Sequence, residues 1–442
     1  MSDEGAASER AGTRASERTR AMTDEPTSAH SDERGESDVA DVATTTRSLA
    51  PQTRWAWVEV DLEAIRHNVR VFRGLIKPPT RLMAVVKADG YGHGAVAVAN
   101  AAKAAGADAF AVATVDEGVQ LREAGIAEPI LILAQPPITS IPLLVQHEIM
   151  PSVYDLEFLA RLGQAAINAG VEARYHLAVD TGMSRIGVLA SEVVEFMRVA
   201  ERLGGIHLDG VFTHFATADL TSGWDFTLQS KRFRDAVAAL RAAKVNPGCV
   251  HCANTPATVL HPEVHYDMIR LGVSMYGLHA APTTEGRIDI RPAMSVKARV
   301  TRAIRPGVGE GVGYGMTYRV ARPSTQIATL PLGYADGLHR CLSNKMEVLY
   351  GGQRWRQVGN ICMDQCMVEV ESEIALVRGR SVKPIEEGDE VVIVGAQGDE
   401  RITLDELAER AGTINYELAC DFGMRLPKVY LNAGGAGTAR TA

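Results

Sequence analysis

The sequence predicts an α/β protein, a (β/α)8 barrel of the TIM type followed by a mostly β C-terminal domain. Eight short runs rich in β-branched residues occur between residues 82 and 276, and they alternate with longer segments whose apolar residues recur every three or four positions. This alternation is typical of parallel strands joined by helices, as in a closed barrel. Beyond residue 291 the helix-length segments disappear and alternating apolar runs replace them, which predicts a second, β-rich domain.

The expected barrel strands are short and apolar, and several end on a polar residue. A doubly wound open sheet is the main alternative, but no G-x-G-x-x-G follows an early strand, so the dinucleotide-binding form of that fold lacks its usual motif. The expected strands are Leu82–Ala88, Ala109–Thr114, Pro129–Ala134, Met150–Tyr154, Arg174–Asp180, Leu208–Phe215, Gly248–Asn254 and Met268–Tyr276. The expected helices include Ala95–Ala105, Leu156–Ala169, Ser191–Leu203 and Thr227–Ala243.

We expect three parts: a disordered N-terminal extension at residues 1–52, the barrel at 53–291 and the β domain at 292–435. The extension is nearly free of large hydrophobic side chains, so burial cannot offset the entropy cost of ordering it. In the β domain, Thr403 and Glu406 form a capping box, which predicts a short helix towards Ala411. The expected β-domain strands are Ser295–Ile304, Thr325–Leu332, Lys345–Leu349, Gln357–Val370 and Asp389–Val394.

Composition and charge favour a small-molecule enzyme. The chain has 442 residues, 46% of them apolar, and a net charge of −8, so we expect no nucleic-acid or anionic-membrane partner. Neither a membrane-spanning run nor a signal-peptide pattern appears. Six scattered cysteines predict reduced thiols in a cytoplasmic protein. Cys249 and Cys252 form one C-x-x-C, but no second pair accompanies it, so we expect no metal site.

Lys87 is the most informative residue of the chain. It ends an apolar strand-like run and precedes a turn that contains Tyr91, Gly90, Gly92 and Gly94. An amine among apolar neighbours has a lowered pKa and can bond covalently to a carbonyl cofactor. A lysine at a strand end can also simply extend its amine to solvent. The glycine-rich turn, which lets the backbone approach a phosphate closely, favours pyridoxal 5'-phosphate.

Polar residues also follow the later expected strands, and the carboxyl ends of barrel strands share one rim. Arg185 follows the fifth strand, and His214 ends the sixth. Each has an ordinary alternative, because His214 could be a core histidine and Arg185 a solvated loop charge. Arg270 could likewise be a surface ion-pair partner. The residues at the last two strand ends are Asn254, Thr255, Arg270 and Gly272.

The string MAVVKADGYGHG around Lys87 resembles the cofactor-lysine motif of bacterial alanine racemases, and the resemblance extends from about Trp55 to Asn432. It implies that Lys87 holds pyridoxal 5'-phosphate covalently. It also implies that the cofactor site, including the surroundings of the phosphate, is built from Tyr91, Asn254, Thr255, Gly272, Val273 and Tyr416.

The resemblance further implies that Arg270 faces the pyridine nitrogen of the cofactor and that His214 orients Arg270. A guanidinium does not give up its proton, so the ring nitrogen stays unprotonated and the cofactor is a weaker electron sink. A short-lived carbanion favours reprotonation over transamination or decarboxylation.

Racemisation needs two bases on opposite faces of the substrate. Lys87 is one, and the resemblance identifies Tyr314, in GEGVGYGMTY, as the other, although a tyrosine between glycines is also a common turn residue. In this family the tyrosine serves the other subunit, which implies a head-to-tail homodimer. The resemblance adds Cys362, Met363 and Asp364 across the interface, Met363 and Arg185 on the substrate carboxylate, and Tyr334 and Tyr416 at the entrance.

One position departs from the family pattern. Many alanine racemases carry a carbamylated lysine two residues before the aspartate of V-D-T-G-M, and here that residue is Ala178. Arg185 therefore lacks this partner, and chloride, another carboxylate or water would have to take its place.

The expected function is pyridoxal-phosphate-dependent interconversion of L- and D-alanine, which supplies D-alanine for peptidoglycan. A racemase that prefers serine or has broader scope, and a basic-amino-acid decarboxylase on the same two-domain plan, are the alternatives. The decarboxylases place a carboxylate, not an arginine, at the ring nitrogen and need no Tyr314. A non-catalytic single-barrel binding protein would not need the β domain.

Overall fold

The structure is a computed structural model that describes residues 53–220, 223–371, 382–423 and 425–433. Eight parallel strands form a nearly closed barrel in the order β10-β2-β3-β4-β5-β6-β8-β9. Between the two end strands, the amide of Asp267 donates to Val250 O (3.0 Å) and that of Arg270 to Ala253 O (2.8 Å). The strands are β2 (Arg81–Val85), β3 (Ala109–Val112), β4 (Ile130–Ile132), β5 (Met150–Val153), β6 (Ala173–Asp180), β8 (Ile206–Phe212), β9 (Cys249–His251) and β10 (Met268–Leu271).

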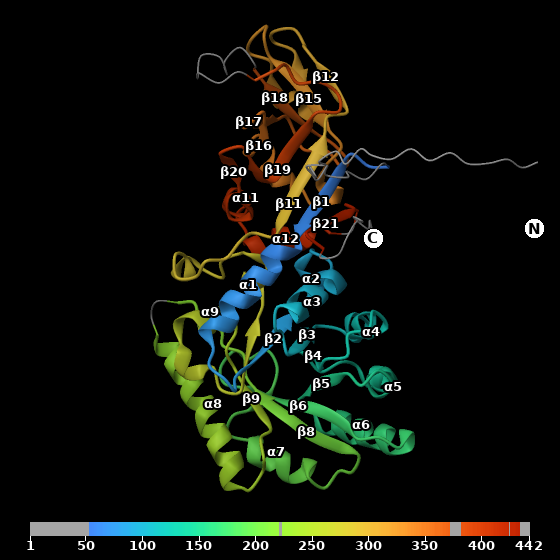
Figure 1. The fold of residues 1–442 in the computed structure, drawn as a ribbon, viewed down its shortest axis with the longest axis vertical. Coiled ribbons are helices and arrows are strands. Elements are labelled where there is room, and N and C mark those ends of the chain that lie inside the picture. Colours follow the sequence, from blue (N-terminus) through green and yellow to red (C-terminus); the bar gives the residue numbers. More distant parts are fainter. Residues whose placement is uncertain (1–52, 221–222, 372–381, 424, 434–442) are drawn as a thin grey trace, which may run out of the picture. The chain divides into compact units, whose positions relative to one another are not determined.

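Each barrel strand is followed by helical structure, and α4, α5 and α6 lie along the outer side of the barrel strands in Figure 1. Their ends follow capping rules: Asp155 accepts from the amide of Phe158 at the start of α6, which ends at the left-handed Gly170. The helices are α1 (Leu62–Leu75), α2 (Lys87–Tyr91), α3 (Ala95–Ala104), α4 (Val115–Glu123), α5 (Ile141–Gln146), α6 (Leu156–Ala169), α7 (Val193–Ala200), α8 (Trp224–Ala242) and α9 (Thr255–Leu260). The predicted barrel is confirmed.

The second domain is a mostly β structure, as predicted. Its large sheet has the order β12-β15-β18-β17-β16-β19-β11-β1-β21, and β20 pairs with β19. The strands are β11 (Met294–Arg299), β12 (Arg302–Ile304), β15 (Gln326–Leu330), β16 (Glu347–Tyr350), β17 (Gln353–Val358), β18 (Cys366–Val370), β19 (Glu390–Gln397), β20 (Glu400–Ile402) and β21 (Lys428–Leu431), with a separate hairpin of β13 (Gly311–Val312) and β14 (Tyr318–Arg319). Helices α11 (Leu404–Ala411) and α12 (Asn415–Asp421) follow β20.

The first strand of the chain does not join the barrel. β1 (Ala56–Asp61) falls inside the range 53–291 but pairs antiparallel with β11 and parallel with β21 (Figure 1). Its residues are almost all buried, because the C-terminal sheet covers both of its edges and α1 follows it directly. The β sheet is therefore built from both ends of the described chain.

Two predicted strands are each split into two. The run Gln357–Val370 contains a loop at residues 359–365 between β17 and β18, where Gly359 adopts φ 74°. The run Ser295–Ile304 breaks after Arg299. Apolar residues also occur inside both breaks, so the sequence pattern alone gave no clear boundary. The expected extension at residues 1–52 lies outside the described residues.

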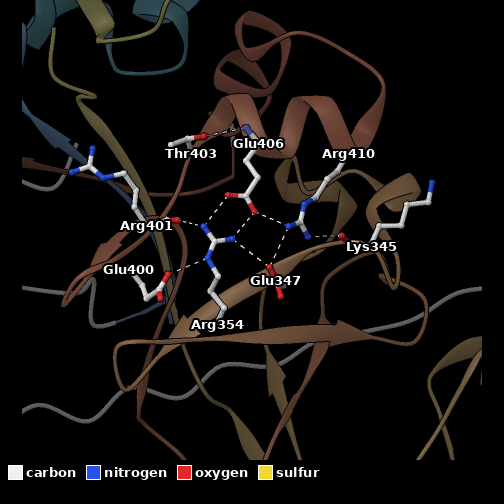
Figure 2. A network of polar contacts seen from close by, with 8 residues as sticks. All are labelled: Lys345, Glu347, Arg354, Glu400, Arg401, Thr403, Glu406 and Arg410. Carbon is white, nitrogen blue, oxygen red and sulfur yellow. Dashed lines mark hydrogen bonds and ion pairs between the residues drawn. The ribbon is translucent and has the colours of Figure 1, made fainter. Parts of the chain in front are cut away.

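Helix α11 begins as predicted at Thr403, whose hydroxyl accepts from the amide of Glu406 (3.0 Å). The carboxylate of Glu406 does not close the capping box. It accepts instead from Arg354 (Nη1, 2.6 Å) and Arg410 (Nη2, 2.7 Å), as Figure 2 shows. Arg354 also contacts Glu347 and Glu400, so this network joins α11 to β16, β17 and β20.

We expect Arg354→Met to lower the free energy of unfolding by about 2 kcal/mol, because it leaves several partly buried carboxylates without their shared partner. Arg161→Met is the matched control, since the one ion pair of Arg161 with a described residue is an exposed i,i+4 pair with Glu157, and it should cost less than about 0.5 kcal/mol. Urea unfolding of both variants measures the difference. Equal small effects would mean that the network contributes no more than a surface pair.

Of the helices in the described ranges, none combines the length and apolar character needed to cross a membrane.

Candidate active site

The chain makes a left-handed helical turn immediately after Lys87. Ala88, Asp89, Gly90 and Tyr91 have φ values of 52°, 50°, 62° and 52°. Such a turn costs roughly 1–2 kcal/mol per non-glycine residue, so the surroundings must hold it in place. The amide of Ala88 donates to Glu117 Oε1 (2.6 Å), at the start of α4.

The C-terminal helix α12 packs closely against this turn. A Cβ on Gly92 would lie 2.1 Å from the carbonyl oxygen of Ala419, so only glycine permits the approach. This contact brings Tyr416 and Cys420 of α12 to the pocket beside Lys87.

Lys87 is half-buried at the carboxyl end of β2. Burial, and then the nearby charge of Arg185, lower the pKa of its amine. A larger fraction of the amine is therefore neutral at a given pH than for an exposed lysine, which makes it a better nucleophile and base.

Lys87 lines a pocket of about 610 Å³. Helix α12 and the loops at the carboxyl ends of the barrel strands form its walls. Every residue assigned to the cofactor from the sequence also lines this pocket: Tyr91, His214, Asn254, Thr255, Arg270, Gly272, Val273 and Tyr416.

One end of the pocket carries hydroxyl and amide groups close together. The amide of Gly272 donates to Thr255 Oγ1 (3.0 Å), and a Cβ on Gly272 would lie 3.2 Å from the hydroxyl of Tyr91. The Tyr91 ring is near those of Tyr276 and Tyr416, at centroid distances of 4.8 and 6.2 Å. The Tyr91 hydroxyl has no hydrogen-bond partner in the described part of the chain, so it is available to a ligand.

Arg270, in β10, is 3% exposed. Its guanidinium donates to Thr213 O (2.8 Å), Cys252 O (3.1 Å) and His251 Nδ1 (2.9 Å). Among the described residues it forms no ion pair with a carboxylate. Burial lowers its pKa to about 10, so Arg270 still carries a proton at neutral pH.

His214 lies beside Arg270, whose Nη2 donates to His214 Nδ1 (3.2 Å). Burial and the charge of Arg270 lower the pKa of His214 to about 3. The imidazole is therefore neutral, with its proton on Nε2.

Five of the remaining predicted residues line a second pocket, of about 680 Å³, in the β domain. Tyr314 is 75% exposed and Met363 is 53% exposed. Lys87 does not line this pocket, and Tyr314 does not line the pocket of Lys87. Its predicted members are Tyr314, Tyr334, Cys362, Met363 and Asp364.

Short contacts fix the loops of this second pocket. Asn360 Nδ2 donates to the carbonyl of Tyr314 (2.8 Å) in the turn between β13 and β14. The amide of Tyr334 donates to Cys362 O (3.0 Å), which joins the two loops. Arg425 binds Asp364 (2.7 Å). Tyr314 thus lies on a hydrogen-bonded turn, and the described residues of its own chain leave it largely exposed.

Arg185 lies in the loop after β6, where Asp180 Oδ1 accepts from the amides of Gly182 (2.9 Å) and Ser184 (3.1 Å). Its side chain is exposed and makes no hydrogen bond or ion pair with the described residues. Ala178 is buried, at 1% exposure. Arg185 lines neither pocket, although its charge lowers the pKa values of Lys87 and His214.

Sequence reasoning missed several residues at the site. Met183, Asp219 and Cys420 line the pocket, and His251 accepts from Arg270. Cys420 follows Tyr416 by four positions, so helical spacing could have identified it. His251 occurs in an apolar run, where a histidine gives no distinguishing signal.

Cys249 and Cys252 are buried, and burial raises the pKa of both thiols. The Cys252 thiol donates to Val264 O (3.3 Å). No group of three or more potential metal ligands was found in the described ranges.

His93, in the turn after Lys87, should make the stability of the protein depend on pH. It is fully buried, and burial lowers its pKa from about 6.5 to about 4. Between these values the unfolded chain binds a proton that the folded chain resists, so stability falls as the pH drops. We expect this residue to contribute about 3 kcal/mol of that fall.

His93→Gln should therefore reduce the loss of unfolding free energy between pH 6.5 and pH 4 in the cofactor-free protein. His207→Gln, at an exposed position of β8, is the control. Urea titrations at several pH values measure both. An unchanged pH slope in His93→Gln would contradict the assignment of a neutral buried imidazole.

Known protein families match the two domains of the chain separately. Residues 60–280 match the family described as alanine racemase, N-terminal domain, and residues 293–430 match alanine racemase, C-terminal domain. Alanine racemase of Symbiobacterium thermophilum is 45% identical over 377 residues, which cover 85% of this chain and 97% of the relative.

Solved structures agree. The crystal structure of alanine racemase from Bacillus anthracis with bound L-Ala-P has a TM-score of 0.81 and 35% identity, and the match covers 88% of this chain and 98% of that chain. Histidine racemase from Leuconostoc mesenteroides subsp. sake has a TM-score of 0.78 and 28% identity, with 87% and 100% covered. The chain belongs to the alanine racemase family.

Proposed function

We propose that this racemase uses pyridoxal 5'-phosphate to interconvert L- and D-alanine. One observation carries the proposal: the same pocket is lined by a half-buried lysine and by a buried arginine that has no carboxylate partner among the described residues. The lysine suits covalent attachment of a carbonyl cofactor, and the arginine suits a ring nitrogen that is to stay unprotonated.

The pocket residues fit this cofactor. The amide of Gly272, the hydroxyl of Thr255 and the unpartnered hydroxyl of Tyr91 are close together, as a phosphate requires. Val273, Asn254 and Tyr416 complete the proposed site. The cofactor, when bound, supplies an electron sink for the bond between Cα and its hydrogen.

Arg270 determines which reaction follows. Its pKa of about 10 keeps the guanidinium charged, so it donates a hydrogen bond without transferring the proton. His214, neutral at physiological pH, accepts from Arg270 and orients it. A carboxylate at this position would favour the decarboxylase alternative, and Arg270 counts against it.

Two bases are needed, and Lys87, whose amine lines this pocket, is proposed as one of them. We propose that Tyr314 of a second copy is the other. Tyr314 is 75% exposed and lines a different pocket of its own chain, which supports a homodimer whose sites combine residues of both subunits.

The substrate carboxylate would be bound by Arg185, which is exposed and unpaired within the described residues, and by Met363 of the other subunit. Cys362 and Asp364 would support that loop. Tyr334 and Tyr416 would narrow the entrance. In the described ranges, no carboxylate pairs with Arg185 in place of the lysine that is absent at position 178.

We further propose that the enzyme is cytoplasmic, which the six free cysteines support. Its proposed role is to supply D-alanine for peptidoglycan. Broader substrate scope is the second candidate, because histidine racemase of Leuconostoc mesenteroides has the same fold.

The test is incubation of the cofactor-loaded protein with L-alanine, L-serine, L-histidine, L-lysine and L-ornithine separately, following optical rotation and evolved carbon dioxide. Fastest loss of rotation with L-alanine and no gas is the expected result. Faster loss of rotation with L-serine or L-histidine would mean that this amino acid, and not alanine, is the preferred substrate. Carbon dioxide from lysine or ornithine would mean that the protein is a decarboxylase.

A further inference from the structure

Two buried histidines behind Arg270 have no part in the proposed chemistry so far. His251, in β9, is 0% exposed, and His176, in β6, is 1% exposed. Neither lines the pocket of Lys87. Burying two imidazoles is costly unless their nitrogens are partnered, so their arrangement requires a reason.

The two rings continue the hydrogen bonds of Arg270 into the barrel. Arg270 Nη1 lies 2.9 Å from His251 Nδ1, and His251 Nε2 lies 2.9 Å from His176 Nδ1. His176 Nε2 lies 3.5 Å from Asp209 Oδ2, at the outer limit of a hydrogen bond. That nitrogen is buried and has no closer partner in the described part of the chain.

Arg270 determines which group donates and which accepts in each hydrogen bond of the series that runs through His251 and His176. Arg270 can only donate, so His251 Nδ1 must accept and its proton must be on Nε2. His251 Nε2 then donates to His176 Nδ1, which places the proton of His176 on Nε2, facing Asp209. Burial lowers the pKa of both imidazoles, which keeps them neutral.

Neighbouring residues keep the rings in this geometry. The ring of Phe212 is stacked on that of His251, with 5.0 Å between the centroids. Arg270 Cζ lies 5.4 Å from the centroid of the Phe212 ring. A Cβ on Gly210 would lie 2.6 Å from His176 Nδ1, so this glycine leaves room for the imidazole. The imidazole of His176 therefore packs directly against the backbone at Gly210.

The series of side chains that starts at Arg270 ends at the carboxylate of Asp209, at the amino side of the barrel. Asp209 directly precedes Gly210, which pairs with the first residue of β9, Cys249. Its Oδ1 accepts from Arg174 Nε (2.9 Å). Burial raises the pKa of Asp209, but the contacts with His176 and Arg174 outweigh it and lower the pKa to about 2, so Asp209 is an anion at physiological pH. The charge of Arg81 also faces both histidines.

We propose that Asp209 is the remote counter-charge of Arg270 and that His176 and His251 connect the two as neutral Nε2–H tautomers. All three are positioning residues, and the proposal rests on the proposed role of Arg270 at the cofactor. The arrangement solves a conflict in the pocket. Arg270 needs a negative partner because it is buried, but a carboxylate beside it could accept and pass a proton at the ring nitrogen.

Two imidazoles between the charges satisfy both needs. Their aligned N–H groups direct a lone pair at Arg270 and an N–H at Asp209, so the carboxylate stabilises the guanidinium through polarised hydrogen bonds. The carboxylate itself stays at the other end of the barrel. Arg270 is thereby held in one orientation with its remaining donor groups free for the pocket.

The experiment compares Asp209→Asn with Arg174→Gln. Both variants break the pair between Arg174 and Asp209, but only Asp209→Asn removes the charge at the end of the chain. In protein labelled with 15N-histidine, with and without pyridoxal phosphate, NMR reports which nitrogen of each ring is protonated. The wild type should show Nε2–H tautomers for His176 and His251.

Asp209→Asn should give His176 a mixture of tautomers and lower kcat by about tenfold, the effect typical of carboxylates behind functional histidines. Arg174→Gln should leave both tautomers unchanged and kcat within about twofold. Equal changes in the two variants, or unchanged tautomers in Asp209→Asn, would overturn the proposal.

A proton on Nδ1 of His251 in the wild type would also overturn it, and this measurement needs no variant to fold. The outcome is separable from the proposed function. Wild-type protein that shows the expected tautomers but leaves alanine unchanged refutes the function, whereas active wild type with an unresponsive Asp209→Asn refutes only the positioning role.

Discussion

Lys87→Ala should lose both the absorbance of the covalently bound cofactor and racemase activity, the latter by about 10²- to 10⁴-fold. Lys87 is the one lysine among the described residues that line the pocket, and burial already lowers the pKa of its amine. Removing it takes away the covalent attachment point and one of the two bases. Absorbance of the purified variant with added pyridoxal phosphate, together with alanine racemisation, measures the two losses.

Lys103→Ala is the matched control, because Lys103 lies on α3 and pairs with Glu128 away from the pocket. It should keep both the absorbance and the activity. A bound-cofactor spectrum that survives in Lys87→Ala would show that another amine holds the cofactor.

Tyr314→Phe should keep the cofactor but slow proton removal from L-alanine by about 10²-fold or more, with a smaller effect on D-alanine. The two faces of the substrate are served by different bases, so losing one hydroxyl affects the directions unequally. The measurement is deuterium incorporation from D2O into each enantiomer.

Tyr318→Phe is the control within the same hairpin, because its hydroxyl donates to Glu369 and it does not line the pocket of Tyr314. It should affect the two enantiomers equally. Equal, mild effects of Tyr314→Phe on both enantiomers would argue against a two-base reaction.

Much of this architecture could be predicted from the sequence. Most residues of the eight barrel strands are buried, so the strand sequences are mainly apolar and are bounded by turns. Because parallel strands end at one rim, the residues after each run could be expected to meet. The structure places Lys87, His214 and Arg270 around one pocket, as that reasoning predicted.

Other features depend on tertiary contacts that no local pattern reveals. β1 pairs with strands more than two hundred residues away, so its membership of the β sheet could not be read from its own sequence. The left-handed turn after Lys87 includes three non-glycine residues and depends on Glu117. His176 and His251 are separate in the sequence and meet only because β8 lies between β6 and β9.

The central claim is that one active site takes Lys87 from one subunit and Tyr314 from another. The direct test mixes inactive Lys87→Ala and Tyr314→Phe proteins under conditions of subunit exchange and measures racemisation of alanine. Random reassortment should restore about one quarter of the sites, because half of the dimers are hybrids and one site in each hybrid is wild type. No recovery, despite exchange demonstrated by mass spectrometry of tagged subunits, would mean that each site is built from a single chain.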